Sequence, residues 1–481
     1  RAGSLSAALP FSHPKSANWW GNYSKYVTSL LKAWWGEHAQ ADTEGGYCYN
    51  YLPKKTGSHD HMSIFENIYK GKTEGLILWG QNPAVGGPNS NKERKALDKL
   101  KWMVISELWE TETAQFWKRP DTNPADIQTE VFLLPACSSV EKEGSISNSG
   151  RWAQWRYPAI HPGDEGWHGD ARSDLWMVDA LYKAIKKEYL KGGVFPDPII
   201  KLNWNYGTGE DIDVNKEPSA HAVASEINGY FIENGKRKGQ VPVFGKLMDN
   251  GTTACGNWIY CGGYVDWSDK EGEKTAPNYV KNELGEFSNR AAKRISEKDE
   301  PKAQKLISQG RAPGMHLNWS WCRPVNRRIL YNRASMDENG NPLNPKRWVV
   351  RWNTELKSKD AKGNDIQGAF EGDIPDGPWP PNEKYPFIMN EEGVGRLFSP
   401  KPNEGPFPEH YEPFESPLSA NPFSSQKNNP VIILYHKGDN LNKELNQIGT
   451  AKEFPIVATT FRLTEHWQAG AMTRNLPWQA E

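Results

Sequence analysis

The chain has 481 residues, enough to bury a sizeable core and ordinarily to hold about two to four domains. Its 58 basic and 59 acidic side chains give a formal net charge of -1. The composition therefore predicts neither a polycationic face for nucleic acid nor an acidic tail. No run of 18 apolar residues is present, so the sequence predicts no membrane-spanning helix.

Strand and helix signals alternate between residues 73 and 135. Short apolar runs at 76–79, 102–105 and 129–135 predict strands, and the charged amphipathic stretch 91–100 predicts a helix. This order predicts an α/β fold: a parallel, Rossmann-like sheet with helices on both faces. Any ligand would then lie beyond the carboxyl ends of the strands.

Polar residues follow the first two predicted strands. Gly80 allows close approach of a backbone, Asn82 offers an amide, and Glu107 is an acid that can bind ribose hydroxyls or amines. No G-x-G-x-x-G motif is present, so a nicotinamide or flavin site is not supported. The alternative is a Gly-Gln-Asn-Pro turn with no ligand.

The region from 195 to 450 is irregular and rich in Pro, Gly, Asn and Trp. Exceptions are a helix predicted over 219–228, with Ser219 in its start signal, and charged helical segments over 282–308 that are interrupted at Pro301. The 22 tryptophans suit irregular segments packed by aromatic side chains.

Residues 459–475 follow an apolar run, 454–458, that predicts a strand. They carry two guanidiniums, an imidazole, four hydroxyls and two amides. Arginine suits bidentate recognition of phosphate, so this segment favours a large anionic ligand. A solvated loop after a strand is the alternative.

The five cysteines contain no C-x-x-C pair, which argues against an iron-sulfur or structural zinc site in this chain. Their odd number argues against a complete disulfide framework. Cys255 and Cys261, the only close pair, are interpreted as packed thiols. The five are Cys48, Cys137, Cys255, Cys261 and Cys322.

The order of motifs in the first 152 residues resembles the dinucleotide-binding domain of the molybdopterin oxidoreductases. The matching patterns are G-x-N-P, V-x-x-(D/E)-x-x-x-T-x-T-A, V-x-L-L-P and E-x-x-G-(S/T)-x-x-N-x-G-R. Where the family has Asp at the end of a strand, this chain has Glu107, which is one methylene longer. The cofactor-binding residues that the resemblance implies here are Gly80, Asn82, Pro83, Glu107, Thr111 and Thr113.

The C-terminal segment resembles the entry to a further domain of the same family. There, a T-x-R-x-x-x-H-x-x-x-x-x-x-T-R/G-N loop wraps a pterin and its diphosphate. The residues of this chain at those positions are Thr460, Arg462, His466, Thr473, Arg474 and Asn475.

Three further blocks, over 249–259, 326–335 and 405–415, resemble the large catalytic subunit of the periplasmic, metal-dependent formate dehydrogenases, and the resemblance covers 17–481. It implies half of a discontinuous dinucleotide-binding domain over 1–190, a bridging region over 191–450, and the first strand and loop of a C-terminal β-barrel domain over 451–481. The proline-rich stretch 405–422 is predicted to lack helix and strand.

The resemblance implies oxidation of formate to carbon dioxide, or the reverse, at a Mo or W ion held by bis-molybdopterin guanine dinucleotide. It also implies a periplasmic location, an iron-sulfur electron-transfer subunit and a possible cytochrome subunit as partners. The family's iron-sulfur motif, metal-binding selenocysteine or cysteine, and catalytic arginine are expected upstream of residue 1, so the segment alone is predicted to be inactive.

Two alternatives remain from the sequence. One is a molybdopterin oxidoreductase that acts on another oxyanion. The other is a secreted carbohydrate-binding protein, which only the tryptophan count and the sequons at Asn22, Asn250 and Asn318 support.

Overall fold

The structure is a computed structural model, and it divides into two units: Arg1–Asn82 with Leu97–Gly395, and Pro83–Ala96 with Arg396–Glu481. It describes residues 23–54, 59–120, 122–148, 151, 153–160, 169–242, 244–264, 323–324, 329–330, 336–337, 339–359, 364–373, 387–388, 418, 452 and 455–456.

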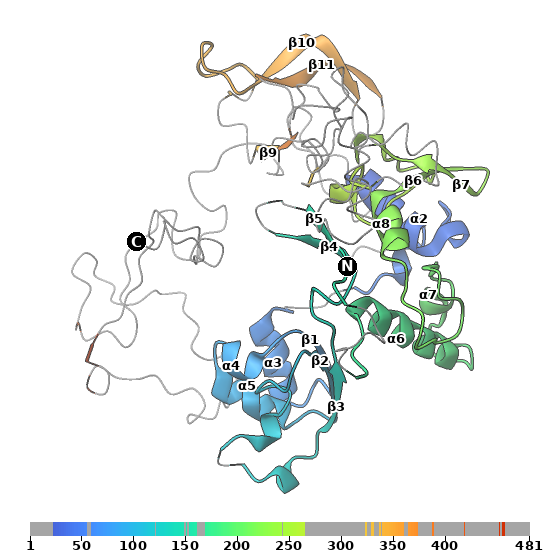
Figure 1. Ribbon diagram of the computed structural model, residues 1–481. Helices are drawn as coiled ribbons and strands as arrows, with labels where there is room; N and C mark the ends of the chain where they lie inside the picture. The colour runs from blue at the N-terminus through green and yellow to red at the C-terminus, as the bar shows by residue number, and fades with distance from the viewer. Residues whose placement is uncertain are drawn as a thin grey trace. The chain divides into compact units, whose positions relative to one another are not determined.

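A three-stranded parallel sheet carries the candidate site (Figure 1). Its strands are β1 (Gly75–Trp79), β2 (Trp102–Glu107) and β3 (Glu130–Pro135), in that order across the sheet. After β3, Ala136 forms a parallel bridge with Arg172, so a fourth short segment continues the sheet. The predicted α/β class, the three strands and their parallel pairing are confirmed.

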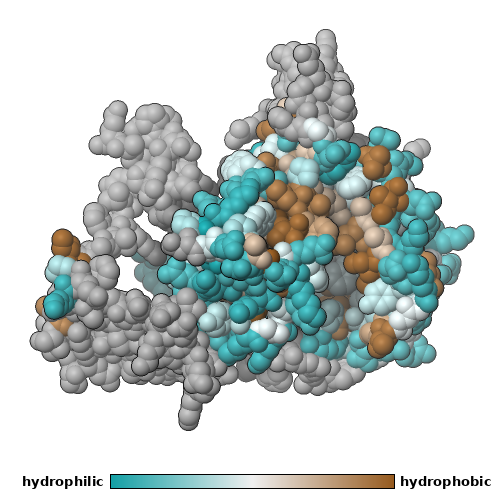
Figure 2. All heavy atoms as spheres, turned by 90° about the horizontal axis from the view of Figure 1, so that it is seen from below, coloured by the Kyte–Doolittle hydropathy of each residue, from teal (hydrophilic) through white to brown (hydrophobic). Residues whose placement is uncertain are grey.

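The two faces of this sheet differ in burial. Met103 and Ile105 point to one face and are fully buried. On the other face Ile77, Val104 and Phe132 lie in register, with Ile77 40% and Phe132 47% exposed. Within the described residues, cover on both faces is therefore incomplete, and Figure 2 shows apolar side chains gathered at the surface of the described part.

The first unit contains the other elements that follow the chain from end to end. Its helices are α2 (Tyr23–Trp35), η2 (Gly36–His38), η3 (Tyr49–Tyr51), α3 (His61–Tyr69), η4 (Phe116–Lys118), η5 (Pro124–Asp126), α6 (Asp174–Tyr189), α7 (Asp197–Ile200), α8 (Ala220–Asn228), η6 (Phe244–Lys246) and η7 (Trp258–Tyr260). Its remaining strands are β4 (Gly144–Ser147), β5 (Ala153–Arg156), β6 (Tyr230–Glu233), β7 (Lys236–Gln240), β8 (Thr253–Ala254), β9 (Ile329–Leu330), β10 (Val350–Lys359), β11 (Asp365–Gly372) and β12 (Phe387–Ile388).

These strands form small separate sheets. β4 with β5 and β10 with β11 are antiparallel pairs, β6 pairs antiparallel with both β7 and β8, and β9 pairs parallel with β12. Between β1 and β2 along the chain lie α4 (Pro83–Gly86), in the second unit, and α5 (Ser90–Leu97), which begins there. The helix predicted over 91–100 is thus confirmed as α5.

Side-chain caps explain where three helices begin. The oxygens of Asp60, Ser173 and Ser219 accept hydrogen bonds from the backbone N–H groups of Ser63, Trp176 and Ala222. Such caps satisfy N–H groups that have no partner within the helix. The predicted start signal at Ser219 is confirmed, because α8 begins at the next residue.

Several expectations lie outside the described residues. They are the helical segments over 282–308, the proline-rich stretch 405–422 apart from Leu418, and the barrel entry over 451–481 apart from three residues. The β-barrel domain and the three domain boundaries remain predictions. Across the described ranges, no helix is long and apolar enough to cross a membrane.

A buried ion pair fixes the loop that follows α7 onto α6. Lys183 Nζ lies 2.8 Å from Asp179 Oδ2 and donates to Thr208 Oγ1 at 2.8 Å, and both charged side chains are about 5% exposed or less. Asp179 also accepts from the Trp204 indole N–H at 2.7 Å. The burial of two charges is tolerated because each has several partners.

We expect Lys183→Met to lower the free energy of unfolding by about 3–5 kcal/mol, since it leaves Asp179 charged and buried. Lys191→Met is the control, because Lys191 pairs with Glu188 at the surface, where a pair contributes about 0–1 kcal/mol. Urea denaturation measures both variants, and equal losses would contradict the role assigned to the buried pair.

Candidate functional site

The candidate site is the carboxyl edge of the parallel sheet, where the loops after β1 and β2 lie side by side. Gly80 follows β1 directly and its N–H donates to Ser106 O at 3.2 Å. Its φ of +60° favours glycine, and a Cβ built there would have no heavy atom within 4 Å. Glu107 ends β2, and its carbonyl accepts from Ala136 N–H at 2.9 Å. The prediction that Gly80 and Glu107 share this edge is confirmed.

Asn82 ties the two loops together. Its Oδ1 accepts from the Thr113 N–H at 3.1 Å and from the Thr113 hydroxyl at 2.7 Å. Its Nδ2 donates to Glu112 Oε2 at 2.7 Å. Because Thr113 is fully buried, its polar groups need these bonds. Asn82 and Thr113 therefore position the edge, and Glu112 is a partner that the sequence did not indicate.

The other two predicted residues at this edge have local roles. The Thr111 hydroxyl accepts from the Ala114 N–H at 3.4 Å, and the Thr111 carbonyl accepts from the Gln115 N–H at 3.0 Å, so Thr111 starts a turn. Pro83 is buried at the first position of α4, where a missing N–H costs nothing. Gly80, Glu107 and Thr111 thus face the edge with Asn82 and Thr113 holding their loops in register.

The third loop of this edge follows β3. Glu141 Oε2 accepts from the Ser138 N–H at 2.6 Å, and Ser173, which lies beyond the short segment paired with β3, caps α6. Lys142 pairs with Asp174 in the first turn of α6. These contacts turn the acidic part of the Glu141 motif back onto its own backbone and the neighbouring helix.

The β4–β5 hairpin, which carries the rest of that motif, is held at its base. Glu143 Oε1 accepts from the Trp155 indole N–H at 3.1 Å and lies 3.1 Å from His221 Nε2. The other ring nitrogen of His221 lies 2.9 Å from the Tyr264 hydroxyl, and the imidazole stacks on Trp155. The sequence motif indicated Glu143 but gave no signal for His221 or Tyr264, which are far away along the chain.

Arg323 holds the other end of the same hairpin. Its Nε donates to Ser147 Oγ at 2.6 Å and its terminal nitrogen donates to Asn148 O at 2.8 Å. Its backbone N–H donates to Arg151 O at 3.1 Å, and Arg151 has a left-handed φ of +66°. The turn of the motif is therefore fixed by a residue more than 170 positions later.

A buried carboxyl lies on α8 near the hairpin. Burial raises the pKa of Glu226 to about 7, although hydrogen bonds from Tyr206 and the positive charge of Arg237 act in the opposite direction. The Tyr206 hydroxyl lies 3.1 and 3.2 Å from the two carboxyl oxygens. Glu226 is thus a group whose charge changes near neutral pH.

The C-terminal candidates Thr460, Arg462, His466, Thr473, Arg474 and Asn475 lie outside the described residues. Among the residues that are described, no group of three or more His, Cys, Asp and Glu side chains is arranged to hold a metal ion. The binding role of all twelve predicted site residues remains a prediction.

Comparison with known proteins gives the context of this edge. A model described as "Molybdopterin oxidoreductase" matches residues 40–184, which include the whole sheet. The alpha subunit of formate dehydrogenase 2 (cytochrome c-553) of Nitratidesulfovibrio vulgaris is 42% identical over 479 residues, which cover 96% of this chain and 41% of the relative. The alpha subunit of the Megalodesulfovibrio gigas formate dehydrogenase is 38% identical over 483 residues, covering 97% and 42%.

A third relative is the major subunit of the nitrate-inducible formate dehydrogenase of Escherichia coli, 38% identical over 484 residues, covering 96% of this chain and 42% of the relative. The chain thus spans about two fifths of the length of the relatives that it matches.

We expect Asn82→Ala to loosen the edge, because it leaves the buried Thr113 N–H and hydroxyl without their acceptor, at a cost of about 1–3 kcal/mol. Hydrogen exchange at the Thr113 amide should become faster. Asn123→Ala is the control, since Asn123 makes an exposed cap to the Ala125 N–H. Unchanged exchange at Thr113 in Asn82→Ala would show that Asn82 does not position this loop.

The Glu226 pKa predicts a pH dependence of stability. Between about pH 4.5, the usual pKa, and about pH 7 the folded state binds more protons than the unfolded state. The free energy of unfolding should therefore fall as the pH rises through this window. Glu226→Gln, which stays neutral, should remove that slope and be more stable at pH 8 by up to about 3 kcal/mol.

Urea denaturation at pH 5 and pH 8 measures this effect. Glu233→Gln on β6 is the control, since that carboxyl is exposed and pairs with Lys238 at the surface. The assignment would be wrong if Glu226→Gln and the unmodified chain lost the same stability between the two pH values.

Proposed function

We propose that this chain, a homologue of formate dehydrogenase alpha subunits with a molybdopterin oxidoreductase domain, is part of a subunit that oxidises formate to carbon dioxide or runs the reverse reaction. The observation that carries the proposal is the alignment with three formate dehydrogenase subunits through at least 96% of the chain. The geometry of the sheet edge supports a binding role for this segment.

The cofactor of the proposal is bis-molybdopterin guanine dinucleotide with Mo or W. When bound, it supplies the two-electron chemistry at the metal. The residues at the sheet edge suit such a ligand, because Gly80 has a left-handed backbone with open space where a side chain would stand. Parallel sheets bind nucleotides at this edge.

The segment's own task in this proposal is to bind and orient. The Glu107 carboxylate would accept hydrogen bonds from ribose hydroxyls or from an amine of the base, and the Gly80 backbone would face a phosphate or ribose. Asn82 and Thr113 keep both loops in place before the ligand arrives, which lowers the ordering cost of binding.

The C-terminal segment would contact the same cofactor from another side. We assign Arg462 and Arg474 to the pyrophosphate or pterin, since guanidinium groups bind phosphate oxygens in pairs. Thr460, His466, Thr473 and Asn475 would add single hydrogen bonds. This assignment rests on the motif resemblance.

The rest of the proposed enzyme follows from its reaction. Two electrons leave formate, so an iron-sulfur cluster elsewhere in the subunit and an iron-sulfur partner subunit would carry them away. One relative is named for cytochrome c-553, which supports a cytochrome as a further partner. We further propose a periplasmic location, and the domain division at residues 190 and 450.

The proposal is tested on the intact subunit. Purified protein should contain pterin and Mo or W, and should reduce an artificial electron acceptor when formate is added. Reduction with another substrate and none with formate would favour a relative of different specificity. Protein without pterin would contradict the cofactor assignment.

Arg462→Ala and Arg474→Ala should each lower retention of the cofactor in the intact subunit, because each charged hydrogen bond to phosphate contributes about 1.5–3 kcal/mol. Metal and pterin content per polypeptide measures the loss. Arg347→Ala, which removes the same charge from an exposed position, is the control. Wild-type content in both variants would refute the assignment of the C-terminal segment.

A further inference from the structure

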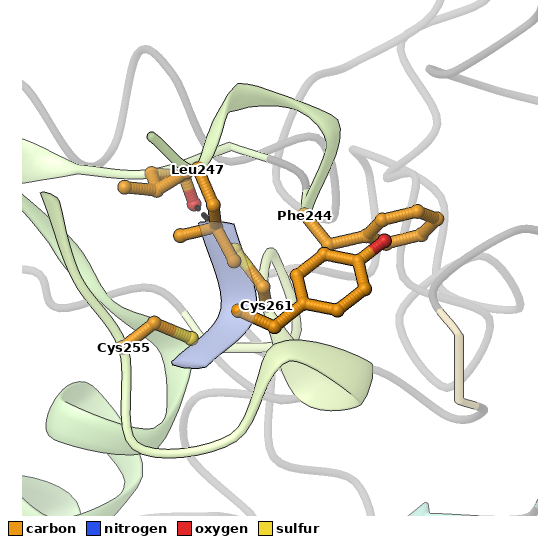
Figure 3. Close-up of a cluster of buried hydrophobic side chains, with 6 residues drawn as sticks. Phe244, Leu247, Cys255 and Cys261 are labelled. Atoms are coloured by element: carbon orange, nitrogen blue, oxygen red, sulfur yellow. Dashed lines mark hydrogen bonds between the residues drawn. The ribbon is translucent and has the colours of Figure 1, made fainter. Parts of the chain in front are cut away.

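Two buried thiols meet in the core beneath α2. Cys255 is 1% exposed and Cys261 is fully buried, and both belong to one apolar cluster with Tyr26, Val241, Phe244 and Leu247 (Figure 3). The side chains of Cys255 and Cys261 hydrogen-bond to each other. Both thiols are free.

The segment between the two cysteines is a short closed loop. Cys255 N–H donates to Ser29 O on α2, and Gly256 N–H donates to Glu226 O on α8. The loop then forms η7, in which Trp258 stacks on Tyr26 with ring centroids 4.4 Å apart. These contacts hold both ends of a seven-residue stretch, 255–261, so that their sulfurs touch.

The cluster keeps these thiols protonated and protected. Burial, together with the hydrogen bond to Cys255, raises the pKa of Cys261 well above its usual value. Each sulfur also points at a carbonyl: Cys255 Sγ donates to Ile227 O at 3.2 Å, and Cys261 Sγ lies 3.9 Å from Val241 O. Since only thiolates react quickly, oxidation requires a local opening of the cluster.

We propose that Cys255 and Cys261 are a latent disulfide, which forms within this loop when the protein meets a peroxide. The sulfurs need only move from hydrogen-bond contact to a bond of about 2.05 Å. This inference concerns the stability and redox state of the fold and is independent of the proposed activity.

The reaction balances with a peroxide as the oxidant. One thiolate attacks the peroxide, the O–O bond breaks, and a sulfenic acid and hydroxide form. The second thiol then attacks the sulfenic sulfur, the S–S bond forms, and water leaves. Two electrons pass from the two sulfurs to the peroxide, and for hydrogen peroxide the by-product is two water molecules.

The test uses the purified protein, treated with hydrogen peroxide, unfolded in N-ethylmaleimide and digested with trypsin. Both cysteines lie on one tryptic peptide, 247–270. We expect this peptide to lose two hydrogens and take up no label, whereas before oxidation it takes two labels. Met62, which is 61% exposed, serves as an internal measure of the peroxide dose through its sulfoxide.

Variants identify the pair. Cys255→Ser should abolish the loss of two hydrogens, and Cys137→Ser, which removes another buried thiol, should leave it unchanged. If peptide 247–270 still takes two labels once Met62 is oxidised, or if either cysteine is joined to a different peptide, the proposal is wrong. This reading comes from the unmodified protein, so it stands even where a variant does not fold.

Discussion

The parallel pairing of β1 with β2 is the constraint on which the candidate site depends. In a parallel pair, both strands end at the same edge, so Gly80 and Glu107 are neighbours although 26 residues separate them along the chain. A single side chain, Asn82, then converts this closeness into a fixed arrangement by accepting two hydrogen bonds from Thr113. The edge is held by its own residues and does not need a ligand to bring the loops together.

Much of this edge followed from the sequence because its signals are local. Apolar runs predicted the three strands, and Ser219 predicted the start of α8. The role of Asn82 did not follow, since an amide beside a strand end serves a ligand or a loop equally well. Only the distances to Thr113 show that its carbonyl oxygen is occupied within the fold.

Contacts between distant segments were the part that the sequence did not show. His221 and Tyr264 meet Glu143, and Arg323 meets Asn148, through pairings that no periodic pattern encodes. The interpretation of Cys255 and Cys261 as packed thiols is confirmed, but their mutual hydrogen bond depends on how α2 and α8 hold the loop between them.

The placement of charge inside this chain separates two uses of buried polar groups. Asp179 and Lys183 satisfy each other, and several neutral donors and acceptors complete the set, so that pair fixes a loop without a net buried charge. Glu226 is different, because Tyr206 donates to it but burial still raises its pKa to about 7. Since Glu226 O also anchors Gly256 beside the thiol pair, a change in its charge would act on the same α8 end that keeps Cys255 and Cys261 enclosed. Proton uptake at Glu226 and opening of the thiol cluster are therefore expected to be linked through α8.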